Sequence, residues 1–105
     1  MAAQVKWTAE AEKALDEAVY QCWQKFGGNV SAHFYDQVKN QDRYFATDPN
    51  IEKLEPLLAH KSHAYRSLVV HKLYKIVYYI DADAVYIVDL WDVRRNPDAL
   101  AERIR

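Results

Sequence analysis

The chain has 105 residues and a formal net charge of −1, and half of its residues are hydrophobic. This length fits one domain over residues 1–105 and leaves no room for a second. Because the chain holds only two glycines and three prolines, its composition excludes disorder and indicates a packed core. No apolar stretch approaches the ~20 residues that a membrane span needs, so we expect no contact with a membrane.

The amino-terminal residues lack the hydrophobic stretch of a secretory signal, and the single cysteine, Cys22, cannot form an internal disulfide. Both features predict a cytoplasmic protein. The charge is uneven: residues 1–59 carry six Lys and Arg against nine Asp and Glu, whereas residues 60–105 carry eight against six. A mild basic bias of this kind permits contact with phosphates but does not by itself predict nucleic-acid binding.

The amino half of the sequence predicts a short strand followed by two helices. Residues 4–7 are typical of a strand, and Thr8 offers a side-chain oxygen that caps the next helix. Apolar residues then recur at helical spacing until Gly27 and Gly28, where glycine ends the helix. A second helix is predicted from near Ser31, so the two helices form a hairpin.

The carboxyl half predicts strands, because its apolar period changes from 3.6 residues to 2. After an irregular connection over residues 48–64, strands are expected at 65–70, 73–80 and 85–91. Pro97 fits the first turn of a final helix with Asn96 as its cap. The order strand, helix, helix, three strands and helix predicts an α+β fold, in which a small antiparallel sheet carries the helical hairpin on one face.

The strand pattern also predicts which side chains share a face of the sheet. If Val70 pairs with Leu73 across a two-residue turn, then Arg66, Lys75 and Tyr79 share one face. The other face would carry the residues that suit helix packing: Tyr65, Val69, Tyr74, Ile76, Tyr78 and Ile80. A three-residue loop would reverse this parity. A cationic and aromatic face of this kind can bind a phosphate or stack a base, although a solvated face with two ordinary cations is the simpler interpretation.

Arg94 and Arg95 follow the last predicted strand directly. Two adjacent arginines can clamp a phosphate, but they can equally pair with nearby carboxylates. Three histidines have a spacing that fits no standard zinc ligand set, so no metal site is expected: His60, His63 and His71. The sequence has no glycine-rich phosphate loop and no nucleophile elbow, and no residue is catalytic on its own pattern.

Three segments of the carboxyl half carry a resemblance to a known family. They are residues 65–70 (Tyr-Arg-Ser-Leu-Val-Val), 74–80 (Tyr-Lys-Ile-Val-Tyr-Tyr-Ile) and 85–97, which ends in Val-Arg-Arg-Asn-Pro. Their order resembles the carboxyl half of RelE/ParE-type toxins of type II toxin–antitoxin, or plasmid stabilisation, systems. The amino half agrees in plan, so the resemblance spans nearly the whole chain.

The resemblance implies a toxin that is neutralised by a cognate antitoxin and needs no cofactor. RelE-like members are metal-independent endoribonucleases that cut messenger RNA, usually on the ribosome, whereas ParE-like members inhibit DNA gyrase. In the ribonuclease case, the resemblance makes Arg66, Lys75 and Arg95 catalytic. The expected RNA-binding residues are then Arg94, Tyr79, His71 and Lys72. An inactive module that only binds an antitoxin is a third hypothesis.

Three departures weaken the ribonuclease pattern. A second basic residue that is often seen on the second strand is replaced here by Leu68 or Val70. Lys75 stands where the ribonucleases usually have arginine, so the bidentate guanidinium is lost at that position. Some ribonuclease members also add a Tyr or His near the carboxyl end, and beyond Trp91 this chain has neither.

Overall fold

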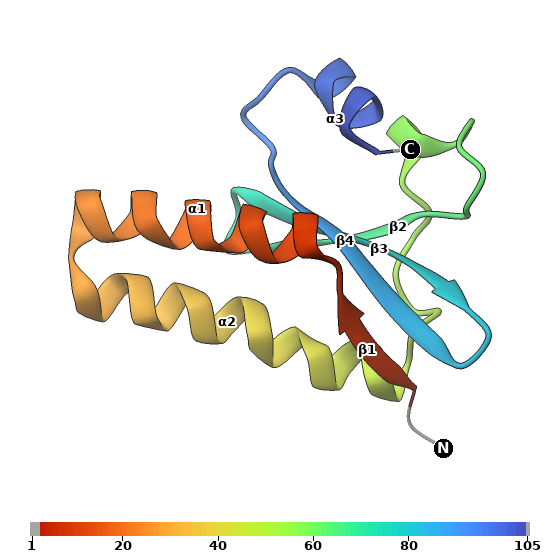
Figure 1. Cartoon of the computed structure of the whole chain (residues 1–105), viewed down its shortest axis with the longest axis horizontal. Coiled ribbons are helices and arrows are strands. Elements are labelled where there is room, and N and C mark those ends of the chain that lie inside the picture. Colours follow the sequence, from red (N-terminus) through yellow and green to blue (C-terminus); the bar gives the residue numbers. More distant parts are fainter. Residues whose placement is uncertain (1–2, 105) are drawn as a thin grey trace.

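The computed structural model describes residues 3–104. The elements follow in the order β1 (Gln4–Trp7), α1 (Ala9–Phe26), α2 (Gly28–Thr47), the 3₁₀ turn η1 (Pro56–Leu58), β2 (Arg66–Val70), β3 (Tyr74–Asp81), β4 (Ala84–Asp92) and α3 (Pro97–Arg103). In Figure 1 the α1–α2 hairpin lies along one side of the sheet and extends well beyond it, while α3 lies near η1. This arrangement confirms the expected α+β fold.

The sheet has the strand order β1-β4-β3-β2. β2, β3 and β4 form the expected antiparallel meander, but β1 pairs with β4 in parallel, with Gln4 opposite Ala84 and Trp7 opposite Ile87. The sheet is therefore mixed rather than wholly antiparallel. A parallel neighbour is possible here because the two helices separate β1 from the rest of the sheet in the chain.

The helix boundaries follow local chemistry. Thr8 caps α1 as predicted, since its Oγ1 accepts a hydrogen bond from the Ala11 amide at 3.2 Å. α1 ends because Gly27 has a φ of 84°, a left-handed value that glycine adopts without strain. α2 then starts at once, at Gly28, three residues before the start predicted near Ser31. Asn96 caps α3 as predicted, by accepting from the Asp98 amide at 3.1 Å.

The larger core lies between the helical hairpin and the first face of the sheet. Its buried residues come from α1, α2 and three strands: Ala11, Ala14, Leu15, Ala18, Phe34, Val38, Phe45, Val70, Ile76, Tyr78, Val85, Ile87 and Leu90. The rings of Phe45 and Tyr78 lie 4.5 Å apart. Burial raises the pKa of Tyr78 to about 12, and its hydroxyl donates to the Pro49 carbonyl at 2.9 Å. The helical hairpin therefore covers this face as predicted.

The second face of the sheet, which the sequence predicted to be open, carries a core of its own. Its buried residues are Leu58, Tyr65, Val77, Trp91, Leu100 and Ile104. They bring η1 and α3 onto this face, so that only part of it stays accessible. Tyr65, which we expected against the helices, belongs to this second core, and Val69 is 55% exposed.

The reversed parity of β2 explains these differences. The β2–β3 turn has three residues, because Val70 pairs with Tyr74 and not with Leu73. His71 and Lys72 both adopt positive φ, 55° and 61°, which sequence does not signal at non-glycine residues. Val69 consequently pairs with Lys75, and Arg66 pairs with Tyr78. The predicted two-residue register was wrong, and with it the placement of Arg66 and Lys75 on one face.

Among residues 3–104, no helix has the length and apolar character that crossing a bilayer requires.

Candidate functional site

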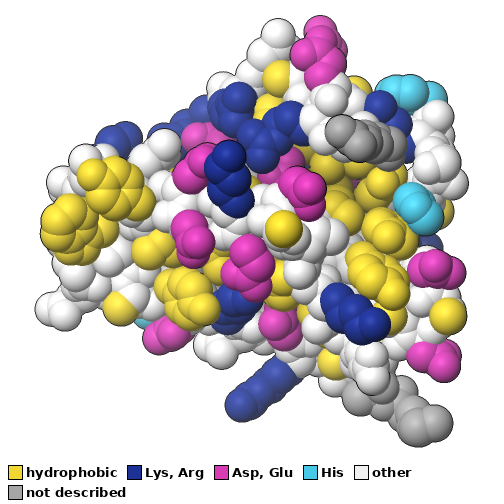
Figure 2. All heavy atoms as spheres, in the orientation of Figure 1, with side chains coloured by type: hydrophobic (Ala, Val, Ile, Leu, Met, Phe, Trp, Pro, Cys, Tyr) yellow, Lys and Arg dark blue, Asp and Glu magenta, His cyan; other side chains and the backbone are white. Residues whose placement is uncertain are grey.

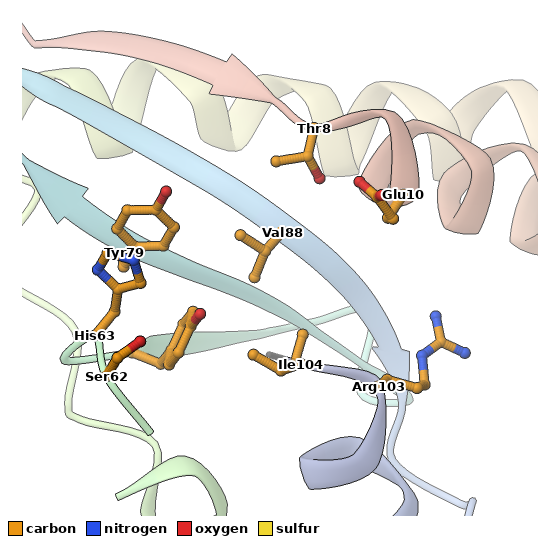
Figure 3. A pocket seen from close by; sticks show the side chains of 9 residues that line it. Thr8, Glu10, Ser62, His63, Tyr79, Val88, Arg103 and Ile104 are labelled. Carbon is orange, nitrogen blue, oxygen red and sulfur yellow. The ribbon is translucent and has the colours of Figure 1, made fainter. Parts of the chain in front are cut away.

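A cleft of about 540 Å³ lies on the second face, between the start of α1, the loop before β2 and the end of α3. Its lining residues are Thr8, Glu10, Ser62, His63, Tyr65, Tyr79, Val88, Arg103 and Ile104. Figure 3 shows His63 and Tyr79 at one end, Arg103 at the other, and Val88 and Ile104 between them. The cleft therefore combines an aromatic end with a cationic end.

The aromatic end is a set of stacked rings. The His63 imidazole lies on the Tyr79 ring, with centroids 3.8 Å apart and planes 14° apart. Tyr79 and its cross-strand neighbour Tyr86 are also nearly parallel, at 5.2 Å, and the Lys6 ammonium lies 5.6 Å from the centre of the Tyr86 ring. Tyr65 meets Tyr79 edge-on at 5.6 Å. Stacked aromatic and cationic groups of this kind suit the flat face of a nucleobase.

The cationic end depends on an irregularity of β4. The β3–β4 register shifts so that Tyr78 pairs with Ile87 but Val77 pairs with Asp89, which leaves Val88 as an extra residue. Asp89 is buried, and its Oδ1 accepts from the Arg103 guanidinium at 2.8 Å and from the Leu90 amide at 2.9 Å. This ion pair fixes the last turn of α3 against the sheet.

Asp89 is an incompletely satisfied partner for Arg103. Its Oδ2 is buried and has no hydrogen-bond partner among residues 3–104. Burial raises the pKa of Asp89, although the charge and hydrogen bond of Arg103 oppose that rise. Because only one carboxylate oxygen engages Arg103, and Arg103 is itself exposed, the guanidinium keeps donors for an anion in the cleft.

Glu10 and Thr8 form the wall of the cleft that α1 provides. Thr8 joins α1 to the sheet, since its amide donates to the Ile87 carbonyl at 3.0 Å. Glu10 lies in the first turn of α1, where the helix dipole favours a negative charge. The cleft thus presents an imidazole, a carboxylate and a guanidinium, the three groups that move protons and stabilise charge in phosphate chemistry without a metal.

Arg66 and Lys75, two of the residues expected to be catalytic, lie on opposite faces of the sheet. The Arg66 guanidinium donates to the backbone carbonyls of Asn50 and Glu52, so it holds the connecting segment. Lys75 lies on the second face, where its Nζ is 2.6 Å from the buried carboxylate of Glu55. Neither lines the cleft, and the structure does not bring them together.

Glu55 is held ionised beside Lys75. Burial alone would raise the pKa of Glu55, but hydrogen bonds from Lys75, the Leu57 amide and Ser67 together lower it below its ordinary value. The corresponding distances are 2.6, 3.1 and 2.9 Å. Glu55 therefore neutralises Lys75 and anchors the loop before β2 to the second face.

The other predicted site residues are spread over the molecule. Arg94 is paired with Asp92 through two hydrogen bonds of 3.0 and 2.8 Å, and Arg95 lies 4.8 Å from the centre of the Trp91 ring. His71 and Lys72 form the β2–β3 turn, with His71 edge-on to Phe34. Of the seven residues, Tyr79 is the one in the cleft.

Sequence reasoning missed most of the cleft for identifiable reasons. Tyr86, which lies beside the cleft and does not line it, follows from the pairing of β3 with β4, because it lies opposite Tyr79. Arg103 lies in the last turn of α3, three residues after the buried Leu100. His63 gave no signal, since it lies in an irregular segment. No group of three residues able to hold a metal ion occurs in the described part of the chain.

Comparison with known proteins gives a match at the level of the fold. No protein-family model and no curated protein sequence matches the chain. Among solved structures, a chain described as "Chromosomal ParDE TA system from P. aeruginosa" matches with a TM-score of 0.72 and 14% sequence identity. The match covers 86% of this chain and 95% of that chain. The protein therefore has the RelE/ParE-like fold that its strand motifs implied.

Proposed function

We propose that the protein is the toxin of a toxin–antitoxin module, neutralised by a cognate antitoxin, and that it cuts messenger RNA in the cleft on the second face. The toxin assignment is supported by the motif order of the carboxyl half and by the fold shared with a chain of a ParDE TA system. The ribonuclease assignment depends on one observation: His63 is stacked on Tyr79 in a cleft that also holds Glu10 and Arg103.

This proposal moves the predicted active site away from Arg66 and Lys75. A nucleobase would pack against the aromatic end of the cleft formed by His63 and Tyr79, and Arg103 would bind a phosphate of the same strand. His63 would accept the proton of the ribose 2′-hydroxyl, since imidazole is the side chain that most often acts as a general base. The 2′-oxygen then attacks phosphorus, and the 5′-oxygen leaves with a proton from solvent, giving a 2′,3′-cyclic phosphate.

A gyrase inhibitor is the second candidate. It is favoured by the ion pairs that occupy three of the basic residues: Lys75 with Glu55 and Arg103 with Asp89 on the second face, and Arg94 with Asp92 beside Tyr74. Paired cations are weaker phosphate ligands than free ones. A protein-directed toxin needs no proton-transfer group, so His63 would then be dispensable.

The test is induced expression in a bacterial host of wild type, His63→Ala and the matched control His60→Ala. His60 is exposed in the same connecting segment but does not line the cleft. We expect growth arrest with fragmented messages for wild type and His60→Ala, and a loss of at least about 100-fold in cleavage for His63→Ala. Co-expression of the product of the neighbouring reading frame should restore growth.

Other outcomes separate the candidates. Arrest with intact messages and impaired supercoiling, unchanged in His63→Ala, would replace the ribonuclease by the gyrase inhibitor. Healthy growth with every variant would leave an inactive antitoxin-binding module. Arg103→Lys sharpens the result, because it keeps the charge beside Asp89 but loses the forked donors that a phosphate prefers.

A further inference from the structure

The proposed cleavage leaves one wall of the cleft without a role. Thr8 and Glu10 line the cleft from the start of α1. Figure 3 shows both residues on that wall, with Val88 lying between the wall and Tyr79. A base that packs against Tyr79 and lies over Val88 therefore turns one of its edges toward Thr8 and Glu10.

Glu10 presents two hydrogen-bond acceptors to the cleft. It is exposed, and among residues 3–104 no hydrogen bond or ion pair engages its carboxylate. The other acidic residue of the first turn, Glu12, differs, because its carboxylate is paired with Lys39 at 3.0 Å. An ionised carboxylate can only accept hydrogen bonds, so Glu10 selects a partner with two adjacent N–H donors.

Thr8 supplies a donor beside these acceptors. Its Oγ1 accepts a hydrogen bond from the Ala11 amide at 3.2 Å, as the cap of α1. The same hydroxyl keeps its own hydrogen, for which the described part of the chain offers no acceptor. The α1 wall thus presents one donor followed by two acceptors.

Guanine is the base whose Watson–Crick edge complements this pattern. Along that edge guanine carries one acceptor, O6, followed by two donors, the N–H groups of N1 and N2. Cytosine has the opposite groups throughout, adenine has a single donor next to an acceptor, and uracil has an acceptor on each side of its single donor. Each of these three bases sets an acceptor against the Glu10 carboxylate, and a polar group left without a partner weakens binding.

We propose that the α1 wall selects guanine, so that the protein cuts RNA on the 3′ side of guanosine. The inference rests on the proposed function and names the substrate class of the same cleft. Thr8 donates to O6, the Glu10 carboxylate accepts from N1 and N2, and Arg103 binds the 3′-phosphate. The 2′-oxygen of this guanosine attacks that phosphate after His63 has taken its proton, and the 5′-oxygen of the next nucleotide leaves with a proton from solvent.

A role of Glu10 in helix stability alone predicts a different result. Glu10 and Glu12 both lie in the first turn of α1, where the helix dipole favours a negative charge. Glu10 lines the cleft, whereas Glu12 is joined to α2 through Lys39. Glu12→Gln is therefore the matched control, because it removes the same charge from the same turn away from the cleft.

The experiment measures the dissociation constants of the four nucleoside 3′-monophosphates for the full chain, by NMR titration of the Glu10 and Val88 amides. We expect guanosine 3′-monophosphate to bind at least about tenfold more tightly than the other three, as a bidentate contact to a base does. In a second arm, a single-stranded RNA with one guanosine in a run of uridines should be cut after that guanosine.

Two variants test the individual contacts. Glu10→Gln replaces one acceptor by a donor, so the preference for the guanosine over the adenosine nucleotide should fall at least about tenfold. Glu12→Gln should keep that preference within about twofold. Thr8→Asp still caps α1 but has no hydrogen to donate to O6, and it should weaken binding of the guanosine nucleotide at least about tenfold.

Equal binding of the four nucleotides, binding of none of them, or an unchanged preference in Glu10→Gln would overturn the guanine assignment. Cleavage of RNA without regard to guanosine leaves the proposed function in place and sinks the selectivity. Selective binding of guanosine 3′-monophosphate with intact RNA does the reverse, and it would make the cleft a site for a free guanine nucleotide.

Discussion

The two faces of the sheet are built in different ways. The first face packs against α1 and α2 through a continuous apolar core, in which Phe45, Ile76 and Ile87 are fully buried. The second face divides its area between a smaller core under α3 and η1, two buried carboxylates, and an accessible aromatic cleft. The first face therefore determines the fold, and the second face carries the groups with chemistry.

This difference shows which residues contribute mainly to stability and which carry the polar and charged groups near the cleft. On the first face most side chains contribute through burial, and a buried polar group such as the Tyr78 hydroxyl needs a partner, here the Pro49 carbonyl. On the second face Glu55 and Asp89 each hold a cation, which keeps charge near the cleft at a cost in desolvation. Substitutions on the two faces should consequently change different observables, and the following predictions test that division.

The largest effect is expected on the first face, from Phe45→Ala. Phe45 is fully buried and its ring lies 4.5 Å from that of Tyr78, so truncation leaves a cavity. We expect a loss of about 3–5 kcal/mol in the free energy of unfolding, measured by denaturant titration. Tyr35→Ala, at a 41% exposed position of the same helix, is the control and should cost less than about 1 kcal/mol. Similar losses for both would deny that the first face dominates stability.

Next comes Glu55→Gln, which breaks the Lys75 ion pair on the second face. The carboxylate is almost fully buried but the Lys75 side chain is 24% exposed, so solvent screens part of the interaction. We expect a loss of about 2 kcal/mol at pH 7 by the same titration. A loss of unfolding free energy as large as that of Phe45→Ala would show that this ion pair contributes as much to stability as the apolar core of the first face.

The same substitution predicts a pH dependence. The pKa of Glu55 is lowered on folding from an ordinary value of 4.5, so the unfolded chain binds the proton more tightly. Its contribution is therefore fully present above pH 4.5 and is lost as the pH falls through the lowered pKa. Unfolding titrations between pH 6 and pH 3 should show a steeper decline for wild type than for Glu55→Gln. Parallel curves would contradict the assigned direction.

Asp89→Asn should have a smaller effect than Glu55→Gln, although both replace a buried carboxylate. Burial raises the pKa of Asp89 and its Oδ2 lacks a partner, so ionised Asp89 costs nearly as much as its pairing with Arg103 gains. We expect a change of less than about 1 kcal/mol at pH 7. The readout that separates the roles is RNA cleavage, which should change because Arg103 loses its anchor while stability is retained.

A further small effect is predicted at the turn that joins the two helices. Gly27 has a φ of 84° and open space around the position of a Cβ atom, so Gly27→Ala introduces backbone strain without a clash. We expect a loss of about 1 kcal/mol. Gly28→Ala is the matched control, because Gly28 is helical and unobstructed, and it should be neutral or slightly stabilising. Equal losses at the two positions would show that the left-handed turn is not the cause.

Much of the fold was predictable because its signals are local. Thr8, Gly27 and Asn96 each act through a bond or angle within a few residues, and the helical hairpin follows from apolar periodicity. The cleft was not predictable, because the residues that line it are far apart in the sequence. The face on which each β2 residue lies depends on the positive φ of His71 and Lys72. The position of His63 depends on the course of an irregular loop. A one-residue difference in a turn was enough to place Arg66 on the wrong face.

The parallel pairing of β1 with β4 has a consequence for how the protein is made. Gln4 pairs with Ala84, so β1 cannot join the sheet until most of the chain has left the ribosome. The α1–α2 hairpin emerges earlier, with its core side uncovered and with large apolar side chains at its tip, including Tyr20, Trp23 and Phe26, each more than half exposed. Figure 2 shows hydrophobic side chains gathered at that end of the folded molecule. Contacts between residues so distant in the sequence slow folding. Chaperones can therefore bind the exposed apolar surface of the hairpin during synthesis.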